Sequence, residues 1–190
     1  WKRGKIVRLQ VAAASRPQLP AYQAPQQPPY GEVERINAKF AEGEWRPIVL
    51  IDVHQEPLQI YELYRAADFC LVNSLHDGMN LVAKEFVAAR DDEQGVLILS
   101  TFAGASRELS EALIVNPYDV SAVGGAIDRA LRMPQSEQRE RLRIMRDIVR
   151  GRNVSRWAGQ MLVDAAQIRK KRRMIAMMKP RGTVVARQGS

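Results

Sequence analysis

The sequence has little cysteine and histidine and no long apolar run. Its one cysteine, Cys70, excludes an internal disulfide and predicts a reducing, cytoplasmic compartment. It holds two histidines, and although His76 precedes Asp77, the other ligands of a metal phosphohydrolase are missing, so no metal site is expected. No apolar run approaches the roughly 18–20 residues that cross a bilayer, so a membrane partner is not expected either.

Positive charge is plentiful but unevenly distributed. The 190 residues include 29 Lys and Arg against 21 Asp and Glu, a net charge of +8. Eight of the basic residues and no acidic residue lie in 169–190, so the remaining 168 residues carry 21 charges of each sign. Basic runs at a terminus are most often solvated and mobile. We therefore predict a disordered tail over 169–190 and do not expect nucleic acid as the main ligand.

Short apolar runs alternate with helical patterns along the chain. We expect a buried strand at 5–14, an irregular proline-rich arm over 15–29, and strands at 48–53, 69–73, 96–100 and 113–115. The expected helices are 30–40, 58–67, 81–89, 119–131, 136–150 and 154–168. All-apolar strands that alternate with helices predict an α/β fold with a parallel sheet covered on both faces.

Two of the helices carry further signals. Asp119 is the expected N-cap of helix 119–131, and Ser136 is expected to open helix 136–150. In the latter helix Leu142, Met145 and Val149 share one face. Its arginines are expected mostly on the other faces: Arg139, Arg143, Arg146 and Arg150.

The segment 69–85 joins a strand, a loop and a helix. In open α/β sheets ligands bind beyond the carboxyl ends of strands, where this loop lies. A helix that opens after Gly78 presents free N–H groups from Met79 to Val82, which favour a phosphate. The carboxylates of Asp77 and Glu85 suit sugar or ribose hydroxyls. An ordinary turn at Asp77 with an ordinary N-cap at Asn80 explains the spacing equally well.

A second loop, over 100–106, follows the next strand and is rich in small residues. It is expected either to line the same cleft or to be only a tight connection between a strand and a helix.

The stretch Asp77–Ala88 (DGMNLVAKEFVA) resembles the signature of trehalose-6-phosphate synthases, and the resemblance extends over about residues 5–168. Further matching stretches are 14–16, 21–23, 95–100, 102–105 and 112–119. The resemblance implies a retaining glycosyltransferase of the GT-B class. Residues 5–168 would be its C-terminal, Rossmann-like donor-binding domain, truncated at the N-terminus, and 169–190 a tail.

The resemblance also implies roles for individual residues. Asp77 would bind a hydroxyl of the donor glucose, and Glu85 would bind the donor ribose. The backbone of 78–80 (Gly78, Met79 and Asn80) would approach the donor sugar, while Leu81 and Val82 offer N–H groups to the diphosphate. Arg16 matches an arginine that binds the phosphate of the acceptor, for which a guanidinium is well suited.

The implied reaction transfers glucose from UDP-glucose, or from ADP- or GDP-glucose, to glucose 6-phosphate, with retention and without a cofactor. The family's N-terminal domain and its basic diphosphate-binding pair are absent from these 190 residues. We therefore expect the chain alone to bind nucleotide sugar weakly and to show no measurable transfer. A homo-oligomer is an open expectation.

Other functions fit the sequence as well. One is a related glucosyltransferase with another phosphorylated acceptor, such as a glucosylglycerol-phosphate synthase that uses glycerol 3-phosphate. Another is a noncatalytic regulatory or assembly module that keeps the fold. The intact pair of Asp77 and Glu85 favours a donor-binding function over this second alternative.

Overall fold

The computed structural model describes residues 4–11, 30–151 and 167–169, and it divides the chain into two compact units. The first unit covers 1–62 and the second covers 63–190. The proline-rich arm, most of the predicted helix 154–168 and nearly all of the basic tail lie outside the described residues, so the proposed boundary at 168 stays a prediction. None of the described helices is both long and apolar enough to span a membrane.

The first unit contains a two-stranded parallel sheet. Strand β1 (Arg8–Val11) pairs with β2 (Ile48–Ile51), and helix α1 (Tyr30–Phe40) packs against β2. The side chain of Asn37 ties helix to strand, because its Nδ2 donates to the Ile48 carbonyl over 2.9 Å and its Oδ1 accepts from the Ile48 N–H over 3.1 Å.

Strand β1 is not buried, so the prediction of a buried strand is wrong for its described part. Leu9 and Val11 are each about 40% exposed. Within the described residues β2 is the one strand that pairs with β1, which leaves β1 at an edge. An apolar run shows that a strand is suited to burial, but the neighbouring elements determine whether it is covered.

The second unit is built on a three-stranded parallel sheet. Its strands are β3 (Phe69–Val72), β4 (Val96–Ser100) and β5 (Leu113–Val115), with β4 in the centre. Helix α2 (Pro57–Ala66), which crosses the boundary between the units, precedes β3, and helix α3 (Leu81–Ala89) follows it. The predicted bounds of α3, β4 and β5 are confirmed to the residue.

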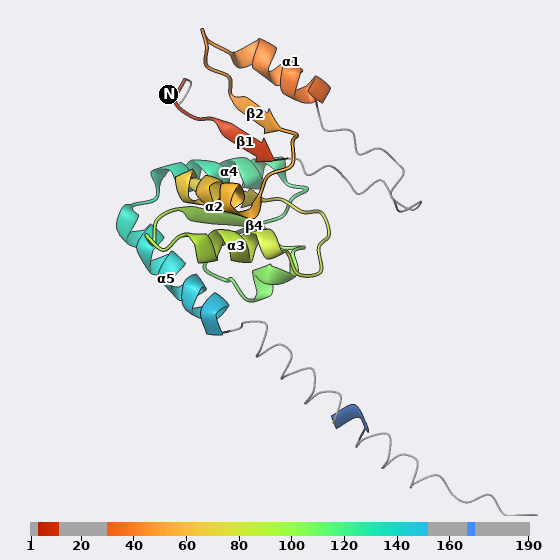
Figure 1. Cartoon of the computed structure of the whole chain (residues 1–190), viewed down its shortest axis with the longest axis vertical. Coiled ribbons are helices and arrows are strands. Elements are labelled where there is room, and N and C mark those ends of the chain that lie inside the picture. The colour runs from red at the N-terminus through yellow and green to blue at the C-terminus, as the bar shows by residue number, and fades with distance from the viewer. Residues whose placement is uncertain (1–3, 12–29, 152–166, 170–190) are drawn as a thin grey trace, which may run out of the picture. The chain divides into compact units, whose positions relative to one another are not determined.

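Helices cover both faces of this sheet (Figure 1). On one face Leu97 and Leu99 of β4 belong to a core shared with α3 and with α5 (Gln135–Gly151). On the other face Val96 and Ile98 pack with α4 (Val120–Arg132). All five residues of β4 are buried. The predicted parallel sheet with helices on both faces is therefore confirmed.

The two predicted helix starts have different outcomes. Asp119 is the N-cap of α4, as predicted, and its carboxylate accepts from the Ala122 N–H over 2.9 Å. Helix α5 begins at Gln135, so Ser136 already lies inside it and the predicted opening at Ser136 is wrong. The Gln138 N–H donates to the Pro134 carbonyl over 3.0 Å, which closes the first turn one residue earlier than expected.

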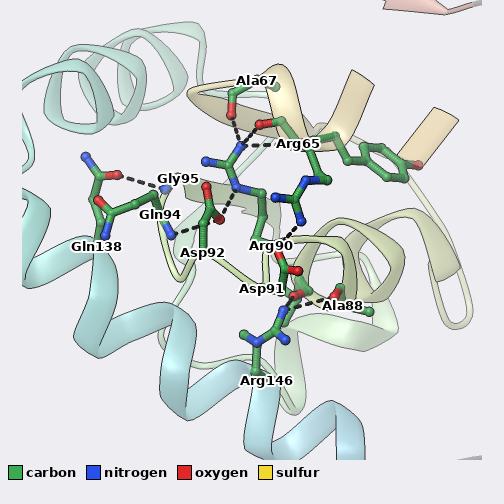
Figure 2. Close-up of polar contacts among 12 residues, drawn as sticks. Arg65, Ala67, Ala88, Arg90, Asp91, Asp92, Gln94, Gly95, Gln138 and Arg146 are labelled. Carbon is green, nitrogen blue, oxygen red and sulfur yellow. Dashed lines mark hydrogen bonds and ion pairs between the residues drawn. The ribbon is translucent and has the colours of Figure 1, made fainter. Parts of the chain in front are cut away.

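The apolar face of α5 is confirmed, with one addition. Leu142 and Met145 are buried and Val149 packs beside them. Arg146, expected away from this face, is also buried and donates from Nη1 to the carbonyls of Val87 and Ala88 over 3.1 and 2.9 Å (Figure 2). Since these carbonyls lie at the C-terminal end of α3, the buried charge satisfies acceptors that the helix leaves unpaired.

Candidate functional site

The loop of residues 74–80 lies at the carboxyl end of β3 and leads into α3. Its central feature is the Asp77 carboxylate, whose Oδ1 accepts from the N–H groups of Met79 and Asn80 over 3.0 and 2.9 Å. These two amides are therefore occupied within the loop. The prediction of free N–H groups is wrong for Met79 and Asn80, because a short acidic side chain competes for nearby backbone donors.

Asn80 holds the loop to the helix. It is buried, and its Oδ1 caps α3 by accepting from the Ala83 N–H over 2.9 Å. Its Nδ2 donates to Asp77 Oδ2 over 3.0 Å and to Ser74 Oγ over 3.3 Å. The backbone has φ 67°, in the left-handed region that Asn tolerates better than most residues. The turn and the N-cap, which the sequence offered as the alternative to a phosphate site, are both present, and the Asn80 side chain joins them.

Helix α3 presents open N–H groups at its next two positions. The amides of Leu81 and Val82 belong to the first turn, where a helix supplies no acceptor. Among the described residues no acceptor is bound to either amide. Leu81 and Val82 are 59% and 43% exposed, so this end of the helix is accessible. Two adjacent amides at a helix N-terminus suit an anionic group such as a phosphate.

The second predicted loop packs directly against the first. The Asp77 N–H donates to the Phe102 carbonyl over 3.2 Å, and the N–H groups of Gly104 and Ala105 donate to the carbonyls of Asp77 and Met79 over 2.9 and 2.8 Å. The two loops thus form one structure at the carboxyl edge of the sheet. Sequence spacing predicted both loops but left their contact open.

The two glycines of this structure have different environments. A Cβ on Gly104 would lie 2.1 Å from the Gly78 carbonyl oxygen, so only glycine permits this approach of two backbones. A Cβ on Gly78 would meet no heavy atom of the described residues within 4 Å. Gly78 therefore leaves open space beside the free amides, which is consistent with close approach of a ligand. The importance of Gly104 was not foreseen, although its small-residue loop was a signal.

Glu85 lies at the start of the second turn of α3 and is half-buried. Tyr64, in the last turn of α2, donates from its hydroxyl to Glu85 Oε2 over 3.3 Å. Nearby, Lys84 Nζ and Glu108 Oε2 form a partly buried ion pair at 3.1 Å, which links α3 to the residues after the second loop. Sequence reasoning identified Glu85 but neither Tyr64 nor the ion pair, because both contacts depend on the fold.

The remaining candidates are placed as follows. Arg16 lies outside the described residues. Cys70 packs against the core beside β4, and burial raises the pKa of its thiol to about 12, as expected of an unreactive core cysteine. His76 is exposed in the loop. The described residues contain no group of three or more His, Cys, Asp or Glu side chains placed to hold a metal ion.

A parallel sheet with helices on both faces, and with the loops after its strands gathered at its carboxyl edge, is typical of the Rossmann-like class of α/β proteins. Within that class, the family model of glycosyltransferase family 20 matches residues 1–167, and the chain belongs to this family. The fold is that of the Rossmann-like domains in GT-B glycosyltransferases.

Curated relatives include the trehalose-6-phosphate synthases of Salmonella typhi, 42% identical over 167 residues, and of Klebsiella pneumoniae, 43% identical over 166. Each match covers 87% of this chain and 35% of the relative, so the chain spans about a third of their length.

Solved structures of proteins from this family are also similar to the chain. One from E. coli, bound with UDP-2-fluoro glucose, is 41% identical with a TM-score of 0.80. An α,α-trehalose-phosphate synthase (UDP-forming) from Burkholderia xenovorans, in complex with glucose-6-phosphate, is 45% identical with a TM-score of 0.80. Each match covers 86% of this chain and 36% of the matched chain.

Proposed function

We propose that this chain provides the donor-binding part of a retaining glucosyltransferase that makes α,α-trehalose phosphate. The donor is a nucleoside diphosphate glucose, and the acceptor is glucose 6-phosphate. The observation that carries the proposal is the pair of open amides of Leu81 and Val82, which lie beside the Asp77 carboxylate at the carboxyl edge of a parallel sheet.

In this proposal the start of α3 binds the donor diphosphate. Leu81 and Val82 donate their N–H groups to phosphate oxygens, and the helix dipole favours the negative charge. The free space at Gly78 admits the sugar and diphosphate. The Asp77 carboxylate accepts a hydrogen bond from a hydroxyl of the donor glucose. A carboxylate has about four lone-pair sites, and the loop uses three of those of Asp77.

Glu85 accepts from the ribose hydroxyls of the donor, further along the same helix. Arg16 binds the phosphate of the acceptor through its guanidinium group, as the family resemblance implies. The Asp77 loop, the start of α3 and Glu85 together bind the sugar, the diphosphate and the ribose of one extended donor. The reducing, cytoplasmic compartment expected from the single cysteine stays a prediction.

The chemistry requires positioning and charge stabilisation rather than a protein nucleophile. The bond between glucose C1 and the diphosphate oxygen breaks while a bond from C1 to the acceptor hydroxyl oxygen forms on the same face. The acceptor proton passes to the departing diphosphate. The amides of Leu81 and Val82 stabilise the charge that develops on this leaving group.

The solved relatives support both substrates, since one holds UDP-2-fluoro glucose and another holds glucose-6-phosphate. Several relatives are described as UDP-forming, which favours uridine as the donor base. No cofactor or metal ion is part of the proposal.

The proposal is tested by calorimetric titration of the chain with UDP-, ADP- and GDP-glucose. UDP-glucose is expected to bind. Glu85→Ala is expected to weaken the binding of UDP-glucose about tenfold, because it removes one or two hydrogen bonds to a charged group. The matched control is Glu140→Ala, on the exposed surface of α5, which should change nothing. Unchanged binding by Glu85→Ala would contradict the ribose role, and absence of binding by all three sugars would contradict the donor-site proposal.

A further inference from the structure

Glu85 is oriented by a neighbour that the donor-binding roles do not include. The Tyr64 hydroxyl donates to Glu85 Oε2 over 3.3 Å, and among the described residues Glu85 takes part in no ion pair. A phenol donor uses one lone pair of Oε2 and leaves Oε1 and the other lone pair free. The carboxylate can therefore be held from one side while its other side accepts from a ligand.

The Tyr64 ring is fixed by the core. It contacts the Phe86 ring edge to face, with centroids 6.1 Å apart and an interplanar angle of 86°. Phe86 is fully buried, and Tyr64 packs against the same apolar cluster. The position of the hydroxyl is thus set by buried side chains rather than by solvent.

The backbone of Tyr64 is fixed as well. Buried Arg90, at the end of α3, places Nη1 3.0 Å from the Tyr64 carbonyl oxygen and 2.6 Å from those of Arg65 and Ala67. Its Nε donates to Asp92 over 3.0 Å (Figure 2). Helix α3 therefore holds Tyr64 at both ends, through Phe86 and Glu85 at the ring and through Arg90 at the main chain.

We propose that Tyr64 is a positioning residue that presents the Glu85 carboxylate to the ribose hydroxyls and so strengthens the preference for ribonucleotide over deoxyribonucleotide donors. A free glutamate side chain loses rotamer freedom when it is fixed on a ligand, and this loss weakens binding. The Tyr64 hydroxyl removes part of that loss in advance, as preorganisation does generally. This inference rests on the proposed function, because it requires a nucleotide donor at Glu85.

The test compares two ligands on the 190-residue chain by calorimetry, UDP-glucose and its 2′,3′-dideoxyribose analogue. The wild type should bind UDP-glucose about tenfold more tightly than the analogue. Tyr64→Phe keeps the ring and its contact with Phe86 but removes the hydroxyl. It should reduce this preference about threefold or more, while affinity for the analogue stays unchanged. Tyr118→Phe is the matched control, since Tyr118 is 67% exposed, and it should keep the full preference.

The outcomes separate the inference from the proposed function. A wild type that binds both ligands equally would overturn the ribose role of Glu85 and the inference with it. A wild-type preference that Tyr64→Phe leaves intact would overturn the inference alone. An equal loss of affinity for both ligands in Tyr64→Phe would also overturn it, since a purely structural defect does not distinguish a ribose from a dideoxyribose.

Discussion

The Gly104 N–H donates to the Asp77 carbonyl over 2.9 Å, and a Cβ on Gly104 would lie 2.1 Å from the Gly78 carbonyl oxygen. This contact joins the loops that follow β3 and β4. Because the clashing atom belongs to the backbone, no side-chain rotation relieves it. The arrangement of the Asp77 loop therefore depends on a glycine in the neighbouring loop.

Gly104→Ala is expected to lower the free energy of unfolding by about 1–3 kcal/mol, the usual cost of forcing atoms into a packed region. It should also weaken binding of UDP-glucose, since the Asp77 loop must move. Urea unfolding and calorimetry measure the two effects.

The matched control for this prediction is Gly124→Ala, in α4, where a Cβ meets no heavy atom of the described residues within 4 Å. It should raise stability by about 0.5–1 kcal/mol, because alanine is the better helix former. If Gly104→Ala were as stable as the wild type, the close approach of the two loops would be wrong.

Substitutions of Asn80 are expected to separate its cap from its backbone conformation. Asn80→Gly loses the side-chain bonds but adopts the left-handed φ of 67° without strain, whereas Asn80→Ala loses the same bonds and must hold a Cβ in the left-handed region. The alanine variant should therefore be less stable than the glycine variant by about 1–2 kcal/mol, the cost of a left-handed Cβ. Thermal unfolding of both variants measures the difference. Equal stability would mean that the left-handed conformation is not retained.

Arg90→Met should destabilise the fold by about 2–4 kcal/mol. The substitution removes the guanidinium that donates to the carbonyls of Arg65 and Ala67 at the end of α2. Buried acceptors that lose their donor lower the stability of the fold. The control is Arg132→Met, because Arg132 pairs with Asp128 at an exposed i,i+4 position. That variant should change stability by no more than about 0.5 kcal/mol. Similar losses from the two variants in urea unfolding would contradict the structural role of Arg90.

The Cys70 thiol is expected to be unreactive in the folded chain. Burial raises its pKa to about 12, so at pH 8 almost no thiolate is present. A disulfide exchange reagent should modify Cys70 slowly in the native protein and at once in denaturant. Rapid native modification would show that the thiol is not buried.

The same raised pKa predicts a dependence of stability on pH. The folded chain holds the Cys70 proton more tightly than the unfolded chain, so this stabilising contribution is complete below about pH 9 and is lost as the pH rises toward about 12. Between these values the stability of the wild type should fall more steeply than that of Cys70→Ala. If the free energy of unfolding of the two proteins fell equally with pH, the raised pKa of Cys70 would be contradicted.

Local patterns predicted much of the second unit. Strand β4 and helix α3 have the expected bounds. For β4 the reason is that a short, mostly apolar run fits a strand buried on both faces of a parallel sheet. The burial of Arg146 was not predictable in this way. Helical periodicity assigns a charged residue to solvent, whereas its partners here are carbonyls of a helix far away in the sequence.

The candidate site was predictable in outline but not in its hydrogen bonds. Spacing identified Asp77 and the start of α3, yet it assigned free amides to Met79 and Asn80, which the Asp77 carboxylate occupies. Competition between a side chain and a ligand for the same backbone donors depends on the loop's exact path. The roles of Gly104 and Tyr64 depend on contacts between elements that are separate in the sequence.

The most direct measurement is a titration of the ¹⁵N-labelled chain with UDP-glucose, followed through the amide resonances of α3. If the start of this helix binds the donor diphosphate, the Leu81 and Val82 amide signals should shift strongly, while those of α4 stay in place. The proposal would be contradicted by a saturable titration that shifts other amides and leaves Leu81 and Val82 unmoved.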